Sequence, residues 1–365
     1  MRDVLPNPLT PNRKRPLMSE PERPQFNLAL VGASTLKGKE FKALLQERGF
    51  PVGRLALLDE EEAHGQLTEF DEEPVIIQPV GRDSFRNMAF AVFAASPPFT
   101  EAHWQMAEES GCEVIDLSGA LAGHPQAELR APLVESLIKG QGKLGDRSPD
   151  SRISVSAHPV AMAVSGLLGC LSRNFEVARC VVTVLESASE HGKAGIEELS
   201  RQTINLLSFQ EIPKDVFGSQ VAFNLLSSYG TERRPTLREA EIRIARHIRG
   251  LFGGQAVVPA VRLLQAPIFY GHAFSCFVEL SEGASAESVE EALQRKPFRL
   301  CNDPDDQPDM VKVAGSNEIA LGAIEPDPAV PSGYWIWGAL DNVRLAALNA
   351  VEIAEEKVFA AGRVS

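Results

Sequence analysis

Short apolar runs alternate with stretches of helical periodicity over the first 157 residues. After the first run, Phe41, Leu44 and Leu45 lie at helical spacing and predict a helix. Apolar runs of this length are typical of strands buried in a parallel sheet, and they cover residues 27–31, 54–58, 75–77, 90–94 and 113–116. Strands that alternate with helices predict an α/β fold with a doubly wound parallel sheet, which binds ligands at the carboxyl ends of its strands.

The pattern changes after residue 157 and predicts a second, α+β domain. Strand-like runs cover 180–186 and parts of 257–279, helical stretches cover 195–209 and 237–252, and a strand at 334–337 precedes a long helix rich in Ala and Leu. We expect a disordered tail over residues 1–24, a dinucleotide-binding-type domain over 25–157 and a second domain over 158–332. A C-terminal strand and helix, residues 333–365, are expected to pack on the first domain.

Charge and cysteine usage narrow the classes of function. The formal net charge of −13 disfavours binding to nucleic acid or to an anionic membrane. Arginines cluster between Arg238 and Arg249, but Glu239 and Glu241 lie among them, which indicates a solvated helix rather than a nucleic-acid patch. The five cysteines form no CxxC pair, so we expect no metal site. Their apolar surroundings indicate core residues in a reducing, cytoplasmic compartment, and no apolar run is long enough to cross a bilayer.

The first predicted strand leads into a loop with glycines at both ends. Such glycines let the backbone approach a phosphate at a helix N-terminus, and the candidate cofactor-binding residues are Gly32, Ser34, Thr35, Leu36 and Gly38. The middle glycine of the usual pattern is missing, so a purely structural turn is the alternative. The second strand ends in Asp59, followed by three glutamates. An acidic residue here bonds a ribose hydroxyl and favours NAD over NADP, unless the run is only a solvated loop.

A strand-like stretch at 153–155 and an apolar, helix-like stretch at 164–171 flank a turn that holds Ala161. Such turns are common seats for a nucleophile, because a helix N-terminus stabilises negative charge, and alanine provides none. His272 is a candidate general base or a structural histidine. Arg249 and Glu241, with Arg243 between them, suit the grip of an anion or simple pairing along a helix surface.

Five segments in order resemble the aspartate-semialdehyde dehydrogenase family, from about Asn27 to the C-terminus. Residues 189–199, SEHGKAGIEEL, look like the family's SGAGKAGMEEL stretch. Residues 221–226 are similar to its FAFNxxP run, 241–249 to its ExKxxxExxR helix, 261–272 to its RVPVxxGH element, and 341–351 to its DN…AAxNAV helix. The sequence is most similar to paralogues of the family that lack its cysteine.

The resemblance implies a Rossmann-type first domain, a substrate and dimerisation domain over 158–332, a C-terminal helix that returns to the first domain, and a homodimer. In that family a cysteine thiolate attacks the aldehyde, a hydride leaves to NADP, and phosphate releases the acyl group. The resemblance places the cysteine position at Ala161, the histidine at His272 and the carboxylate-binding arginine at Arg249, with Glu241 and Arg243 in the same pocket. It adds Ser96, Gly192 and Asn342 to the cofactor site.

Several positions depart from the family pattern. Glu186 stands for a substrate-side Gln, Ala122 stands where a phosphate-binding Arg is expected, and the acidic run from Asp59 replaces a loop that binds the NADP 2′-phosphate. These losses predict a catalytically deficient paralogue. Two alternatives stay open: an NAD-dependent oxidoreductase in which His272 acts without a covalent step, and a module that senses a metabolite or binds a partner. NAD is the favoured cofactor, and binding of no cofactor is the alternative.

Overall fold

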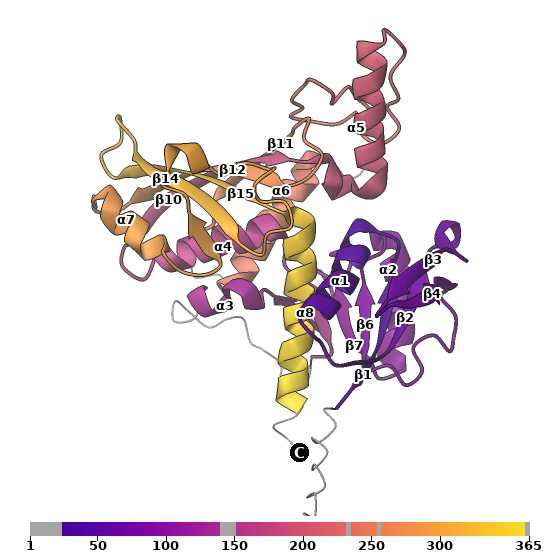
Figure 1. The fold of residues 1–365 in the computed structure, drawn as a ribbon. Coiled ribbons are helices and arrows are strands. Elements are labelled where there is room, and N and C mark those ends of the chain that lie inside the picture. Colours follow the sequence, from indigo (N-terminus) through magenta and orange to yellow (C-terminus); the bar gives the residue numbers. More distant parts are fainter. Residues whose placement is uncertain (1–23, 139–150, 231–234, 254–256, 362–365) are drawn as a thin grey trace, which may run out of the picture.

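The computed structural model describes residues 24–138, 151–230, 235–253 and 257–361. Its first sheet has seven strands in the order β5-β2-β1-β6-β7-β9-β8, and every neighbouring pair is parallel. These strands are β1 (Phe26–Val31), β2 (Val52–Asp59), β5 (Gln78–Pro79), β6 (Phe90–Phe93), β7 (Glu113–Asp116), β8 (Ala127–Arg130) and β9 (Ile153–Ser156). The helices are α1 (Leu36–Glu47), α2 (Pro97–Glu109) and α3 (Pro132–Ile138). The predicted doubly wound α/β sheet is confirmed (Figure 1).

The apolar run predicted as a sheet strand at 75–77 belongs mostly to a separate hairpin. Strand β4 (Glu73–Ile76) pairs with β3 (Leu67–Phe70), and only the short β5 that follows joins the first sheet, beside β2. Ile76 is 54% exposed. The run is too short and too polar on its flanks to be buried on both faces, which is what a central parallel strand requires.

The second domain is built on a mixed sheet of six strands in the order β11-β10-β12-β15-β14-β13. The strands are β10 (Val177–Glu186), β11 (Ala260–Gln265), β12 (His272–Leu280), β13 (Phe298–Leu300), β14 (Ile319–Pro326) and β15 (Gly333–Leu340). The helices are α4 (Pro159–Leu171), α5 (Gly192–Leu207), α6 (Leu237–Leu251) and α7 (Ala286–Leu293), with short 3-10 turns η2 (Ala188–His191) and η3 (Pro304–Asp306). A third such turn, η1 (Glu61–Ala63), follows β2 in the first domain. The predicted α+β character of this half is confirmed.

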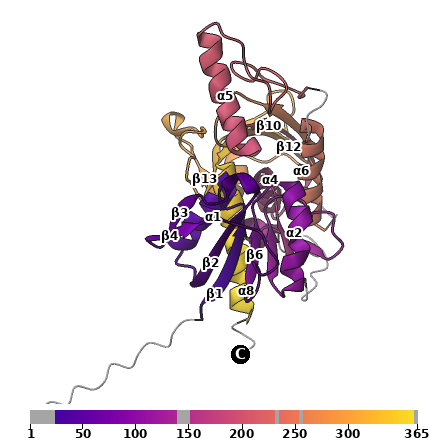
Figure 2. The same ribbon diagram turned by 90° about the vertical axis from the view of Figure 1, so that its right-hand side faces the viewer.

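The C-terminal segment is divided between the two domains. Strand β15 pairs antiparallel with β12 and β14 in the second sheet, so the strand predicted to pack on the first domain does not do so. Helix α8 (Asn342–Ala361) does return to the first domain and lies between the two sheets (Figure 1 and Figure 2). Arg344 of α8 donates to Glu40 at 2.7 Å and to Glu47 at 2.6 Å, which joins α8 to α1.

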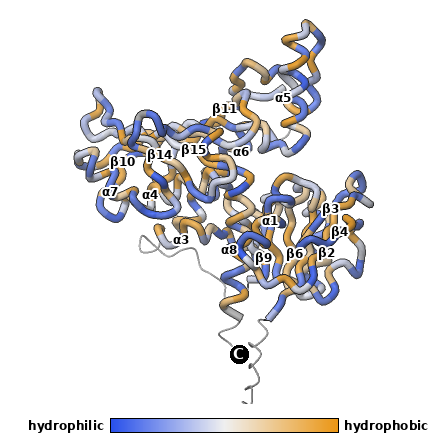
Figure 3. Tube along the Cα trace, viewed as in Figure 1, coloured by the Kyte–Doolittle hydropathy of each residue, from blue (hydrophilic) through white to orange (hydrophobic). Residues whose placement is uncertain are grey.

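One hydrophobic core runs from the first sheet through α4 and α8 to the second sheet. It contains Phe41 of α1, Val164 of α4, Phe274 of β12 and Val351 of α8, all of them fully buried. Helix α5 projects away from this core and carries both polar and apolar positions (Figure 3).

In the part of the chain described, no helix combines the length and apolar character that a membrane span needs. The tail expected over residues 1–24 lies almost wholly outside the described residues.

Candidate functional site

Two glycines shape the loop between β1 and α1. Gly32 has a φ of +87°, and a Cβ there would lie 2.4 Å from the backbone nitrogen of Ala95. A Cβ on Gly38 would lie 2.1 Å from the carbonyl oxygen of Gly32. Thr35 caps α1, because its Oγ1 accepts a hydrogen bond of 3.0 Å from the amide of Gly38. Neither glycine has room for a side chain, so this is the tight turn that a phosphate-binding loop requires.

Carboxylates border this loop at the end of β2. Asp59 is buried and accepts hydrogen bonds from the amides of Ser34, at 2.6 Å, and Glu60, at 2.8 Å. Glu60 accepts a hydrogen bond of 2.6 Å from the hydroxyl of Ser96, at the start of α2. The structure therefore brings together the cofactor candidates at the carboxyl ends of β1, β2 and β6. Leu36 begins α1 beside them.

The turn into α4 keeps a helix cap but offers no thiol. His158 is the N-cap, since its Nδ1 accepts a hydrogen bond of 3.2 Å from the amide of Val160, and Pro159 is the first helical residue. Ala161 is the third residue of the helix, is 0% exposed, and does not line the cleft beside it. Because α4 begins at Pro159 rather than near 164, the predicted cysteine position lies inside the helix. The turn residues that reach the cleft are His158 and Pro159.

A narrow cleft lies between this turn, η2, α6 and the start of α8. Its cavity volume is 20 Å³, which is about the space of one water molecule. The residues that line it are Lys37, Leu117, Ser118, Gly119, Ser156, Ala157, His158, Pro159, Glu190, Arg243, His247 and Ala346. All five cysteines are buried, and none of them lines this cleft. The described residues therefore place no thiol within it.

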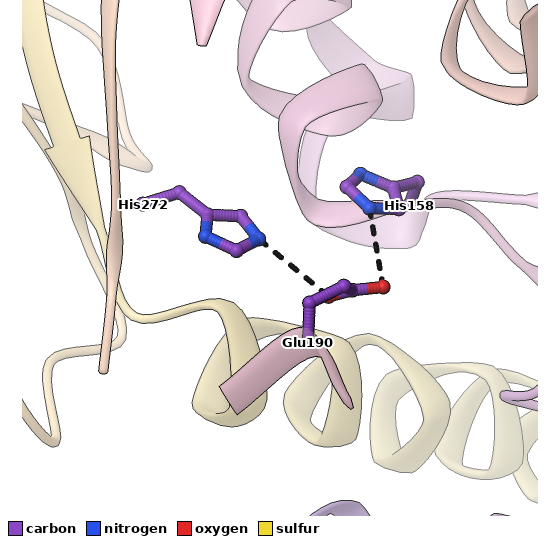
Figure 4. Close-up of side chains that lie close together, drawn as sticks. All are labelled: His158, Glu190 and His272. Atoms are coloured by element: carbon purple, nitrogen blue, oxygen red, sulfur yellow. Dashed lines mark ion pairs between the residues drawn. The ribbon is translucent and has the colours of Figure 1, made fainter. Parts of the chain in front are cut away.

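The carboxylate of Glu190 is the central group of the cleft. It lies 3.6 Å from Nε2 of His158 and 3.5 Å from Nε2 of His272 (Figure 4). Arg243 approaches it at 3.3 Å and Lys37 at 4.0 Å. Burial disfavours the charged carboxylate, but Lys37 and the two imidazoles outweigh burial and hold the pKa of Glu190 well below its usual value. Glu190 is therefore an anion at neutral pH.

Both imidazoles are oriented by hydrogen bonds to Nδ1. The amide of Val160 donates to Nδ1 of His158, and the amide of Ser187 donates to Nδ1 of His272, each at 3.2 Å. A nitrogen that accepts a hydrogen bond carries no proton, so each neutral ring carries its proton on Nε2, toward Glu190. Burial lowers the pKa of His158, which favours its neutral form. Both Nε2 atoms are buried and lack a hydrogen-bond partner, because the carboxylate is too distant.

These three side chains also form a candidate metal site. Their ligand atoms lie within 4.8 Å of one another. A metal-bound imidazole, however, binds through an unprotonated nitrogen and donates from its other N–H to an acceptor. Here Nδ1 of both His158 and His272 receives a backbone N–H, and two cations, Lys37 and Arg243, face the same carboxylate. The arrangement therefore favours an anion rather than a metal cation.

Helix α6 separates the predicted anion-binding residues. Arg243 faces the cleft, whereas Arg249 is exposed and lines a separate surface groove with Arg262. Glu241 is 3% exposed and accepts a hydrogen bond of 3.0 Å from the amide of Leu263 in β11, so it also points away from the cleft. The structure thus brings Arg243, but neither Arg249 nor Glu241, to the side chains around His272.

Glu186 and Gly192 lie on either side of η2, outside the cleft lining. The hydroxyl of Tyr229 lies 3.1 Å from Glu186, 2.7 Å from Nε2 of His191 and 2.7 Å from Oε1 of Gln265. Burial tends to raise the pKa of Glu186, but His191 outweighs this effect and lowers it. Gly192 has a φ of +64° and begins α5. This network buries a second carboxylate next to the cleft.

Asn342 and His247 position the residues of the cleft. Asn342 accepts hydrogen bonds from Ser189, at 2.9 Å, and from the amide of Gly271, at 3.2 Å, and it donates to Glu190 at 3.4 Å. Nδ1 of His247 accepts a hydrogen bond of 3.0 Å from the amide of His158. Burial lowers the pKa of His247 to about 3, so this ring is neutral.

Sequence reasoning did not identify Lys37, Glu190 or His247 as site residues. One signal was present for Glu190, because SEH at 189–191 stands where the resembled stretch reads SGA. Nothing in the local pattern marked Lys37 or His247.

Comparison with known proteins gives two matches to family models. Residues 27–139 match the NAD binding domain of semialdehyde dehydrogenase, and residues 168–345 match its dimerisation domain. The USG-1 protein homolog of Pseudomonas aeruginosa is 32% identical over 340 residues, covering 93% of this chain and 98% of that protein. Aspartate-semialdehyde dehydrogenase 2 of Vibrio cholerae is 29% identical over 333 residues, covering 91% and 97%.

A solved structure of a similar protein has the same fold. Aspartate semialdehyde dehydrogenase II of Vibrio cholerae, solved in complex with ASA, superposes with a TM-score of 0.82 at 28% identity, covering 91% of this chain and 98% of that one. Two matched domains in order, a curated relative that spans nearly the whole chain, and a shared fold lead to one assignment. The chain belongs to the semialdehyde dehydrogenase family.

Proposed function

We propose that this protein is a catalytically deficient member of its family, one that keeps the fold and the nucleotide-binding loop. The observation that carries the proposal is the cleft beside His272, where the turn into α4 presents His158 and Pro159 and no cysteine of the described chain reaches the surface. Attack on an aldehyde carbon requires a nucleophile. In a protease that lost its nucleophile, turnover fell by a factor on the order of 10⁶.

The charge of the cleft supports the same proposal. Glu190 pairs with the cations Lys37 and Arg243, which are the groups best placed to receive an anionic substrate, and offsets one of their two charges. A second anion would meet the repulsion of Glu190 and of the neighbouring Glu186, whose pKa is also lowered. The cleft is thus poorly suited to a semialdehyde that carries a carboxylate.

The assay is phosphate-dependent oxidation of aspartate semialdehyde, followed by the absorbance of the reduced nicotinamide. An active relative is measured in parallel under the same conditions. We expect turnover at least about a hundredfold below that relative. Turnover closer than that would contradict the proposal.

For the cofactor, the proposal is NAD. The fold provides a tight loop at the N-terminus of α1, with Gly32 and Gly38 at its two ends. Asp59 and Glu60 suit the hydroxyl groups of an adenosine ribose and would repel a 2′-phosphate. Bound NAD would supply a hydride acceptor, and the residues Ser34, Thr35 and Ser96 would hold it. Calorimetric titration with NAD and NADP tests this point, and tighter binding of NADP would overturn it.

For assembly, the proposal is a homodimer through the second domain. Val181, Phe277 and Trp335 lie in register across β10, β12 and β15. Val181 is 36% exposed and Trp335 is 41% exposed, so this row crosses a face of the sheet that the chain itself leaves open. Replacement of Trp335 by Glu should shift the mass measured by light scattering from dimer to monomer. An unchanged mass would place the interface elsewhere.

The second candidate function is an NAD-dependent oxidoreductase without a covalent step. His272 favours it, because this ring is fully buried, is held by Ser187 and directs Nε2 toward Glu190 of the cleft. Such an enzyme would reduce NAD in the presence of a semialdehyde whether or not phosphate is added. Replacement of His272 by Gln should then abolish that activity.

A further inference from the structure

The polar groups around Glu190 enclose a space that is wider than its carboxylate fills. We name this set the donor cage: Lys37, His158, Arg243, His272 and Asn342. The donors lie between 3.3 Å and 4.0 Å from the two oxygens of Glu190. Charge-assisted hydrogen bonds between nitrogen and oxygen are usually about 2.7–2.9 Å long. A carboxylate with two oxygens therefore leaves every donor of the cage at a long distance.

The cage also contains polar atoms that lack partners. Nε2 of His158, Nε2 of His272 and Nε of Arg243 are buried and have no hydrogen-bond partner. His272 is 0% exposed and His158 is 6% exposed. Buried donors without partners are costly, and native proteins seldom keep them without a reason. A tetrahedral oxyanion has four oxygens and can accept from more of these donors than one carboxylate does.

The remaining space does not admit such an anion while Glu190 is in place. The cavity of 20 Å³ holds about one water molecule. The cage is built by five elements from both domains, since its members come from α1, the cap of α4, α6, β12 and α8. Glu190 enters it from η2, at a position where the resembled family stretch has glycine.

From these observations we infer that Glu190 is a built-in anion that closes an oxyanion-binding site formed by the donor cage. The native protein excludes phosphate and small carboxylates from this cleft, and removal of the Glu190 side chain opens the site to them. The inference deepens the proposed function, because it names the class of ligand that the cleft is shaped to hold. It concerns binding alone, so it can fail while the proposed function stands.

The main experiment compares anion binding to the native protein and to Glu190→Ala. Inorganic phosphate and succinate are titrated separately by calorimetry, without nicotinamide or aldehyde, so that the two chemistries are distinguished. We expect no saturable binding of either anion to the native protein. Glu190→Ala should bind with an affinity at least about tenfold above any weak binding that the native protein shows. Equal affinity in the two proteins, or no binding to either, would overturn the inference.

Three variants separate space, charge and location. Glu190→Gln removes the charge but keeps the volume, so it should remain closed to phosphate. Lys37→Met, added to Glu190→Ala, should weaken the new binding by about tenfold. Glu197→Ala removes a carboxylate that is 55% exposed on α5, the helix that follows η2, and it should behave as the native protein does. Tight phosphate binding by Glu197→Ala would mean that net charge, and not the cage, controls affinity.

A measurement on the native protein keeps the inference testable if Glu190→Ala does not fold. Nitrogen NMR shifts report which ring nitrogen of each histidine is protonated. The cage requires protonated Nε2 on both His158 and His272, and an unprotonated Nε2 on either ring would remove a donor and overturn the inference. Stoichiometric binding of zinc to the native protein, lost in Glu190→Ala, would also overturn it, because the cluster would then be a metal centre.

Discussion

The loop between β1 and α1 and the turn between β9 and α4 are built alike, but they differ in the residues that they present to a ligand. Each carries a buried parallel strand into a helix, and each has a side-chain cap, Thr35 in one and His158 in the other. In the first, Gly32 and Gly38 pack against backbone atoms at distances that no side chain fits. In the second, the cap is retained while the residues beside it carry no nucleophile.

The difference separates what folding requires from what chemistry requires. A glycine that touches backbone is held in place by the fold itself, because any replacement moves a strand or a helix. A helix cap needs only an acceptor atom, and His158 meets that need as well as other caps do. A catalytic thiol would have no structural partner of that kind, so a turn with this fold forms without one.

The largest effect is expected from the nucleotide loop. Gly38→Ala should lower the free energy of unfolding by about 3 kcal/mol, because the new Cβ meets the carbonyl oxygen of Gly32. Urea denaturation measures it, and Gly123→Ala, where nothing lies within 4 Å, is the matched control. A loss below about 1 kcal/mol would show that the loop is as tolerant as the turn into α4.

A thiol placed at two positions of the turn into α4 should react at different rates. Pro159 and Ala161 are both buried, but a cysteine in place of Pro159 lines the cleft at a helix N-terminus, whereas a cysteine in place of Ala161, which is 0% exposed, does not line it. We expect alkylation about a hundredfold faster at position 159, and no phosphate-dependent semialdehyde oxidation from either variant. The native protein, whose cysteines are buried, gives the background rate. Faster reaction at 161, or full activity in either variant, would break the comparison.

The pH dependence of the free energy of unfolding tests how the turn into α4 is held, because Nδ1 of His247 accepts a hydrogen bond from the amide of His158 in that turn. The pKa of His247 is about 3 in the folded protein against 6.5 in a model compound, so below pH 6.5 the unfolded chain takes up a proton that the folded protein refuses. Stability contributed by neutral His247 is thus lost as pH falls from 6.5 toward 3, by about 2 kcal/mol at about pH 5. His247→Asn should show a flatter profile by that amount, and the exposed His64 changed to Asn should not.

The smallest effect concerns cofactor choice. Asp59→Asn removes the charge beside Ser34 while keeping an acceptor, and it should reduce the preference for NAD over NADP by about tenfold. Calorimetric dissociation constants for both nucleotides measure it. An unchanged ratio would mean that Asp59 fixes the conformation of the loop and does not select the nucleotide.

The sequence predicted the first sheet well because its signals are local. Apolar runs, the glycines at 32 and 38, and the alternation of strands with helices each depend on neighbouring residues. The start of α4 was missed even though Pro159 carried a signal, since proline is favoured at the first helical position. The strand at 334–337 was recognised, but its sheet was not, because pairing with β12 joins residues far apart in sequence.

The site was harder to predict because it depends on side-chain direction. Arg249 lies six residues after Arg243, about 240° around the helix, so only one of them can face the cleft. Arg243 and His247 are four residues apart and share that face. No local pattern predicts the approach of Lys37 and His272 to Glu190, since Lys37 comes from the first domain and His272 lies far from Glu190 in the sequence of the second.

The two crossings of the chain between the domains have a mechanical consequence. One runs from β9 to α4 through Ala157 and His158, and the other runs from β15 to α8 through Asp341. Any rotation of one domain against the other pivots on both connections at once. His158 and Asn342 lie beside these two connections, so both crossings of the chain end at the donor cage.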